Sequence, residues 1–158
     1  GEQFTQKELI DGIHDGMNRG IITPVVCTSA LAQGAIDMLL KEFELLLPSP
    51  AEVYAAEAFD SKDDIIDVKC DASAPVSAFV FKTVADAFVG KMSFIRVMSG
   101  NLTSNSELVN AKTGETEKIG KLYTLCGKKQ TEVSSAAAGD IVIASTIDAH
   151  TSETHCAA

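Results

Sequence analysis

Apolar side chains recur with helical spacing in two stretches of the first fifty residues. The first stretch begins after Thr5, a residue type that favours the N-cap, and Glu8 follows three residues later, as in a capping box. Gly20 is a suitable end for this helix. The second stretch runs from 35 to 47 and ends before Pro48, because proline cannot continue a helix. The apolar stripes consist of Leu9, Ile10, Ile13 and Met17 in the first helix and Ile36, Leu39, Leu40, Phe43 and Leu47 in the second.

An apolar run at residues 21–27 separates the two helices and is typical of a buried parallel strand. Residues 1–50 are therefore predicted to be an α/β fragment in the order helix, strand, helix. The segment 51–74 changes character, and residues 60–64 (DSKDD) carry mostly charged side chains. An EF-hand is excluded there, because the glycine at the sixth position and the glutamate at the twelfth are missing. We expect 51–74 to be a solvated connecting segment.

From residue 75 onward the spacing of apolar positions approaches two, as in β-strands. Strands are predicted at 76–82, 92–98, 107–111, 117–126 and 140–144, with Arg96 facing outward and a hairpin turn at residues 112–114 (KTG). Short strands separated by glycine-containing turns indicate an all-β fold. Because some eighty residues are few for two stacked sheets, we predict a small closed β-barrel for 75–158, which also removes exposed strand edges.

The charge of the chain is unevenly distributed. The total is −9 over 158 residues, which at face value argues against a nucleic-acid-binding protein. However, residues 75–130 hold eight basic and four acidic side chains, whereas the segments on either side are acidic. Such asymmetry can mark different partners for different parts, or simply two solvated surfaces of different sign. The sequence leaves both interpretations open.

The motifs of several enzyme classes are missing. The sequence has no G-x-x-x-x-G-K-[ST] phosphate loop, no G-x-G-x-x-G after a strand and no G-x-S-x-G nucleophile turn. The four cysteines lie far apart, so no metal site is expected, and scattered thiols favour a reducing cytoplasmic location. No apolar run approaches the roughly 20 residues that cross a bilayer, so no membrane association is expected. We predict no catalytic residue in this chain.

Two groups of motifs resemble elongation factor G. Residues 22–31 (ITPVVCTSAL), followed by a helix ending in LLPSP at 46–50, resemble the last part of its GTPase domain. Residues 79–86 (FVFKTVAD) and 88–100 (FVGKMSFIRVMSG) resemble its second domain, a β-barrel. That signature continues at 119–123 (IGKLY), 127–129 (GKK) and 138–142 (AGDIV). Ala87, where the family usually has proline, and Lys121, where it commonly has arginine, depart from the pattern and suggest a divergent relative.

The resemblance implies a piece of a ribosome-associated translational GTPase, which moves tRNA and mRNA through the ribosome. In this family the Ser-Ala motif meets the guanine base, so Ser29, Ala30 and Leu31 are the expected guanine-binding residues of the parent protein. GTP and Mg²⁺ would be cofactors of the parent. This chain lacks the phosphate loop, so we expect it to bind no cofactor and to be inactive alone.

The resemblance also implies partners. The barrel of the family contacts small-subunit ribosomal RNA and the remaining domains of the parent, and DNA is not an expected partner. Lysine and arginine bind phosphates without sequence specificity. Two alternatives stay open: a ribosome protection or release-factor-type GTPase, and a free-standing β-barrel that binds RNA or protein. The candidate RNA contacts are Lys91, Arg96, Lys112, Lys128 and Lys129.

Overall fold

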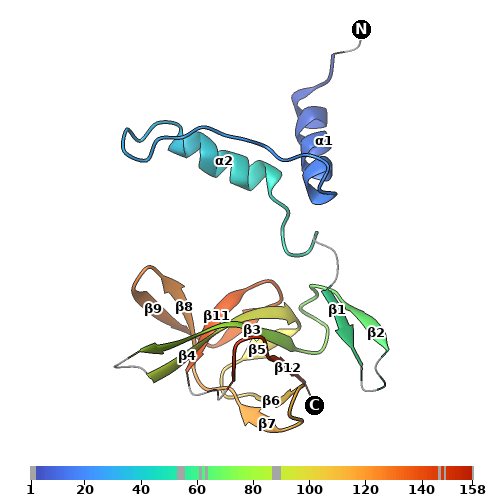
Figure 1. Cartoon of the computed structure of the whole chain (residues 1–158), viewed down its shortest axis with the longest axis vertical. Helices are drawn as coiled ribbons and strands as arrows, with labels where there is room; N and C mark the ends of the chain where they lie inside the picture. The colour runs from blue at the N-terminus through green and yellow to red at the C-terminus, as the bar shows by residue number, and fades with distance from the viewer. Residues whose placement is uncertain are drawn as a thin grey trace. The chain divides into compact units, whose positions relative to one another are not determined.

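The chain forms two compact units, Gly1–Val53 and Tyr54–Ala158 (Figure 1). The structure, a computed structural model, describes residues 3–52, 56–60, 62, 64–86, 90–145, 147 and 149–157. Residues 87–89 of the barrel motif and residues 61 and 63 of the charged stretch therefore lie outside the described residues. Within the described ranges, no helix has both the length and the apolar character needed to span a membrane.

Helix α1 (Gln6–Asn18) begins with the predicted capping box. The Thr5 hydroxyl accepts a hydrogen bond from the Glu8 N–H at 3.3 Å, and the Glu8 carboxylate accepts one from the Thr5 N–H at 2.8 Å. These reciprocal bonds use two of the N–H groups that a helix start leaves without partners. The helix ends at Asn18, and Gly20 follows with a φ of 67°. Both predicted ends are confirmed.

Helix α2 (Ile36–Leu46) confirms the second predicted helix and lies against α1. The ring Nδ1 of His14 is 3.1 Å from the Leu46 carbonyl oxygen, and the two elements bury Gly16 and Leu46. The buried strand predicted at 21–27 is wrong. Residues 22–28 have no strand structure, and Val25 is 88% exposed. The apolar run has the composition of a buried strand, but within the described residues no neighbouring strand pairs with it.

A two-stranded hairpin lies inside the segment that was predicted to be a connection. Strand β1 (Ala56–Phe59) pairs with β2 (Ile65–Val68) in antiparallel register. The charged stretch is the loop between them, where the Asp60 carboxylate accepts hydrogen bonds from the Lys62 and Asp64 N–H groups. The prediction of a loop at 60–64 was therefore right for its described residues, but the strands on either side were missed, because each is only four residues long.

The remaining strands build the barrel-like part of the second unit. Eight of them form one antiparallel sheet in the order β7-β6-β12-β3-β4-β11-β8-β9, and β5 pairs separately with β10. The predicted all-β barrel fold is confirmed. The strands are β3 (Ser77–Asp86), β4 (Gly90–Ser99), β5 (Asn101–Thr103), β6 (Glu107–Asn110), β7 (Thr116–Lys118), β8 (Leu122–Cys126), β9 (Lys129–Val133), β10 (Ser135–Ala137), β11 (Ile141–Ser145) and β12 (Thr154–Cys156).

The predicted strand at 117–126 is wrong as one element, since it divides into β7 and β8. Residues 119–121 separate the two strands: Ile119 is fully buried and its N–H still donates to the Ser106 carbonyl, in register with the β6–β7 pairing, and the chain leaves this pairing after it. The turn predicted at 112–114 is confirmed, and Gly114 has a φ of 75°. Strands β5, β9, β10 and β12 were not predicted. Three of these four are only three residues long, too short to show a period of two.

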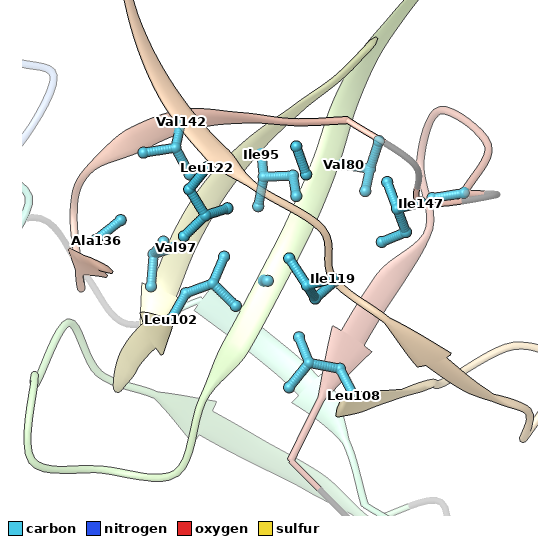
Figure 2. Packing of buried hydrophobic residues seen from close by; sticks show 13 residues of the cluster. Val80, Ile95, Val97, Leu102, Leu108, Ile119, Leu122, Ala136, Val142 and Ile147 are labelled. Atoms are coloured by element: carbon cyan, nitrogen blue, oxygen red, sulfur yellow. The ribbon is translucent and has the colours of Figure 1, made fainter. Parts of the chain in front are cut away.

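One apolar core occupies the space that the barrel strands enclose, as Figure 2 shows. On β4, Ile95 and Val97 point into this core, while Arg96 between them is only partly buried on the other face. This alternation confirms the outward direction predicted for Arg96. The core consists of Ala78, Val80, Ile95, Val97, Leu102, Leu108, Ile119, Leu122, Ala136, Val142, Ala144, Ile147 and Ala149.

Candidate functional site

The expected guanine-binding residues form a tight, exposed loop that leads into α2. The N–H of Ser29 donates to the Gly34 carbonyl and the N–H of Gly34 donates to the Ser29 carbonyl, both at 3.0 Å. The Ser29 hydroxyl accepts a hydrogen bond from the Ala32 N–H at 3.2 Å. Leu31, at the tip, is 99% exposed. Within the described part of the chain, the N–H of Ala30 has no acceptor. The loop thus offers a backbone donor, and the guanine contact stays a prediction.

The five candidate RNA-binding cations do not gather in one patch. Lys128 and Lys129 lie exposed at the tip of the β8–β9 hairpin, and Lys112 lies at the tip of the β6–β7 hairpin. These hairpins form the opposite ends of the strand order, and Figure 1 shows them on different sides of the barrel. Lys91 and Arg96 lie on β4, in the middle of the sheet. The structure therefore presents three separate places where cations could contact phosphate.

Aromatic side chains accompany Arg96 on the outer face of the sheet, a feature that the sequence analysis did not single out. Phe79 of β3 and Ile141 of β11 are its cross-strand partners. The rings of Phe81 and Phe94 lie 6.2 Å apart at 59°, and the Lys82 ammonium lies 5.4 Å from the centre of the Phe94 ring. The alternation of β4 could have revealed this face, since its even-numbered residues from Phe94 onward point away from the core.

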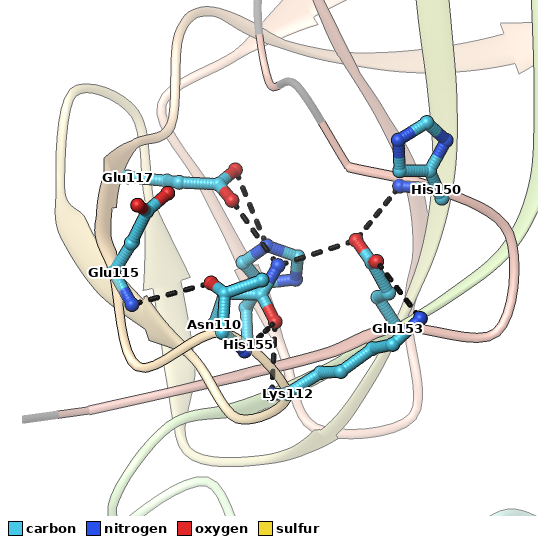
Figure 3. Close-up of polar contacts among 8 residues, drawn as sticks. Asn110, Lys112, Glu115, Glu117, His150, Glu153 and His155 are labelled. Carbon is cyan, nitrogen blue, oxygen red and sulfur yellow. Dashed lines mark hydrogen bonds and ion pairs between the residues drawn. The ribbon is translucent and has the colours of Figure 1, made fainter.

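A buried polar cluster fixes the β6–β7 hairpin that carries Lys112 (Figure 3). The Asn110 side-chain oxygen accepts hydrogen bonds from the N–H groups of Lys112 at 2.9 Å and Thr113 at 3.3 Å. Its amide nitrogen donates to the carboxylates of Glu117 and Glu153, each at 3.2 Å. The Asn110 side chain is 1% exposed, so these bonds satisfy an amide that has no access to water.

His155 of β12 completes this cluster from within the barrel. Its Nε2 lies 3.3 Å from the Glu117 carboxylate, within hydrogen-bond distance. The ring is 1% exposed, and its Nδ1 has no hydrogen-bond partner among the described residues. The cluster therefore ties the last strand to the β6–β7 hairpin, and we assign it a structural role.

Glu153 is the charged centre of the cluster. Its carboxylate accepts a hydrogen bond from the His150 N–H at 2.8 Å and lies 3.9 Å from the Lys112 ammonium. The hydrogen bond from His150 is the main cause that lowers the pKa of Glu153 below its ordinary value of 4.5, and it outweighs the opposing effect of desolvation. Lys112 thus already faces an anion, although its side chain is 76% exposed.

No group of three or more His, Cys, Asp or Glu side chains gathers as metal ligands in the described parts of the chain. The free thiols are spread over both units, with Cys27 and Cys126 exposed and Cys70 and Cys156 partly buried.

Comparison with known proteins identifies relatives of both units. Residues 75–153 match the family described as elongation factor G domain 2. The crystal structure of a protein from Thermus thermophilus resembles the whole chain, with a TM-score of 0.74 and 25% sequence identity. The match covers 100% of this chain but only 21% of that protein, so this chain spans about a fifth of its relative's length.

Proposed function

Because the chain belongs to the elongation factor G domain 2 family, we propose that it is part of a ribosome-associated translational GTPase that acts in the cytoplasm. The observation that carries this proposal is the match over residues 75–153, which contain strands β3 to β11. The whole chain is similar to about one-fifth of a larger protein, which supports the proposal that it works as part of a longer parent. GTP-driven translocation of tRNA and mRNA would be the activity of that parent.

Nucleotide binding would involve the first unit only through its exposed loop. Ser29, Ala30 and Leu31 would lie at the guanine base in the parent, with the Ala30 N–H as donor to the base oxygen. The available N–H fits this contact, since it has no acceptor within the described residues. The bound GTP with Mg²⁺ would supply the phosphate chemistry, and the residues that hold the phosphates would come from other parts of the parent.

Small-subunit ribosomal RNA is the proposed partner of the barrel, besides the remaining domains of the parent. Among the five candidate cations, Lys128 and Lys129 are the best placed, because they are adjacent, exposed and at a hairpin tip. A protruding hairpin can reach a phosphate backbone without rearranging the sheet. Lys112 contributes less, since Glu153 partly neutralises it.

The test is co-sedimentation of the 158-residue chain with purified small ribosomal subunits at several salt concentrations. The Lys128→Gln/Lys129→Gln variant should bind more weakly, and its salt dependence should fall by about two units of log K per log salt, because two phosphate contacts are lost. The matched control is Lys7→Gln/Lys41→Gln, which removes the same charge from the exposed surface of the first unit. Absence of subunit binding at low salt, or an equal loss in the control, would contradict the proposal.

A further inference from the structure

The neighbouring strands β3, β4 and β11 present rings and cations on the face that points away from the barrel core. Phe79, Arg96 and Ile141 are cross-strand partners in one row, and Lys82 pairs with Phe94 in the next row. Ile141 is 57% exposed. Apolar side chains that gather on one exposed face are typical of a surface that another molecule covers. We call this surface the aromatic face, and it consists of Phe79, Phe81, Lys82, Phe94, Arg96 and Ile141.

A β-bulge in β3 puts a ring and a cation next to each other on the aromatic face. The register between β3 and β4 shifts between Val80 and Lys82, so Phe81 has no partner residue on β4. Strict alternation would point Lys82 toward the core, because Val80, two residues earlier, lies in the core. Instead, the Lys82 ammonium lies 5.4 Å from the centre of the Phe94 ring. The Phe81 ring lies 6.2 Å from the same ring, at 59°. The bulge thus gathers two rings and an ammonium at one place.

Arg96 gives the aromatic face a second cation that has no anionic partner. Its side chain is partly buried, and among the described residues its guanidinium has no hydrogen bond or ion pair. The two rows of the aromatic face hold no acidic side chain on β3, β4 or β11. Further along the second row, Glu132 lies two strands beyond β11, on β9, and pairs with Lys121 at 2.9 Å. In a chain with a net charge of −9, this face is therefore complementary to an anion.

We propose that the aromatic face binds a single-stranded segment of RNA, whose unpaired bases stack on the phenylalanine rings. Phe81 would supply the stacking surface, since it is 39% exposed and Phe94 supports its ring from one side. Arg96 and Lys82 would pair with phosphates of the same strand. Rings beside cations are a general means by which proteins hold unpaired bases together with their phosphates. The choice of RNA as the nucleic acid rests on the proposed function.

Other occupants use this combination less well. The bases of a double-stranded RNA are stacked on one another and cannot reach the rings. An acidic peptide would meet the two cations but would bring no planar base to the rings. The aromatic face is also separate from Lys128 and Lys129, which lie at the tip of the β8–β9 hairpin. The two RNA-binding proposals can therefore be tested one at a time.

The experiment measures fluorescence anisotropy of a labelled single-stranded RNA, titrated with the 158-residue chain at several salt concentrations. An RNA of about ten nucleotides is long enough, since one small β-barrel covers a segment of that order. Phe81→Leu should weaken binding about fivefold and leave its salt dependence unchanged, because it removes a ring but no charge. The matched control is Phe59→Leu, since Phe59 is exposed on β1, outside the aromatic face. This control should change the affinity by less than about twofold.

A second pair of variants tests the charge. Arg96→Gln should weaken binding and lower its salt dependence by about 0.7 units of log K per log salt, the contribution of one phosphate contact in a single strand. Arg19→Gln removes the same charge from an exposed position at the end of α1 and should change neither quantity. Phe81→Leu keeps an apolar side chain at an exposed position, so the thermal midpoint of the barrel should stay the same and the binding data remain interpretable.

The proposal is overturned if the single strand does not bind at low salt, if the same strand in a duplex binds equally well, or if Phe81→Leu behaves like Phe59→Leu. Displacement of the RNA by a peptide of alternating glutamate and leucine also overturns it, since the aromatic face would then be a peptide site. Because these variants spare Lys128 and Lys129, failure here leaves the binding of small ribosomal subunits through that hairpin standing. Conversely, stacking of the single strand on Phe81 without any subunit binding would remove the proposed function and keep this site.

Discussion

Glu153 shows how one residue depends on contacts from distant parts of the chain. It is 6% exposed, and its carboxylate is held by the His150 N–H, the Asn110 amide and the Lys112 ammonium. Each of these groups favours the ionised form, which explains why its pKa is lowered although the side chain is enclosed. A group whose pKa is lower in the folded state stabilises the fold above its ordinary pKa and loses that effect as the pH falls.

We therefore predict that Glu153→Gln destabilises the chain at pH 7 and has a shrinking effect on acidification. Below its ordinary pKa of 4.5, the wild-type carboxyl becomes protonated and loses the same stabilisation that the variant lacks at every pH. Urea unfolding at pH 7, 5, 4 and 3 measures the difference between the two midpoints. Glu132→Gln, which removes an exposed pair with Lys121, is the control and should change the midpoint little. A constant difference for Glu153→Gln between pH 7 and 3 would disprove the role of its charge.

For single residues, the sequence predicts contacts between neighbours in the chain but not contacts between distant segments. The capping box of Thr5 and Glu8 could be predicted because both partners lie within one turn. The burial of His155 could not be predicted, because it depends on β12 entering between β3 and β6, which lie far away in the sequence. The five candidate cations were identifiable by type, but their separation into three places follows from the order of the strands.

Among the elements, the junction of β4 and β5 has little tolerance for a larger residue. Gly100 lies between these strands with a φ of 76°. A Cβ atom there would be 2.6 Å from the Val76 Cα and 2.8 Å from the Ala74 carbonyl oxygen. Both atoms belong to the backbone, which cannot move aside as a side chain can. The Gly100 N–H also donates to the Asp71 carbonyl at 2.8 Å, so this glycine attaches the segment before β3 to the barrel.

Gly100→Ala should destabilise the barrel by at least about 2 kcal/mol, because a backbone clash adds to the strain of a positive φ. Gly127→Ala is the matched control, since Gly127 has a φ of 61° but open space around its Cα. It should cost only the conformational strain, about 1 kcal/mol. Equilibrium unfolding in urea compares the two variants. Equal losses in the free energy of unfolding would mean that the close approach of Gly100 to Val76 does not add to the cost of the substitution.

The elements that were predicted correctly from the sequence are long enough for the spacing of their apolar residues to show a helical or strand period. Helices α1 and α2 and the long strands β3 and β4 are of this kind. Residues 21–27 have the composition of a buried strand, but composition cannot supply the neighbours that would bury it. The acidic character of 60–64 led to the prediction that all of 51–74 is a connecting segment. For this reason the hairpin strands β1 and β2 on either side of the charged residues were not predicted.

On the scale of the whole molecule, the two units differ in how much they bury. The described residues of α1 and α2 bury Gly16 and Leu46, while several large apolar side chains of this unit, such as Val25 and Leu31, are exposed. The second unit encloses a continuous apolar core. Because burial of apolar surface is the main stabilising contribution in folding, the second unit should hold nearly all of the stability.

We predict that the backbone amides of residues 3–52 exchange with solvent deuterium much faster than those of β3, β4 and β11. The first unit should open locally without unfolding the barrel, since few buried contacts oppose its opening. Hydrogen exchange followed by mass spectrometry measures this difference. A shortened chain that begins at Tyr54 should keep the thermal midpoint of the barrel within about 3 °C. Loss of the barrel transition in that shortened chain would show that the units depend on each other.

The position of β12 sets a condition on the synthesis of this protein. Thr154–Cys156 lies between β3 and β6, so it joins two strands made much earlier. While the chain is being translated, β3 and β4 can already pair, but the edge of β3 that β12 covers stays open until the last of these residues has left the exit tunnel. Completion of the barrel is thus tied to the release of residues 154–156 from the exit tunnel, and a chain cut just before residue 154 would keep an uncovered edge on β3.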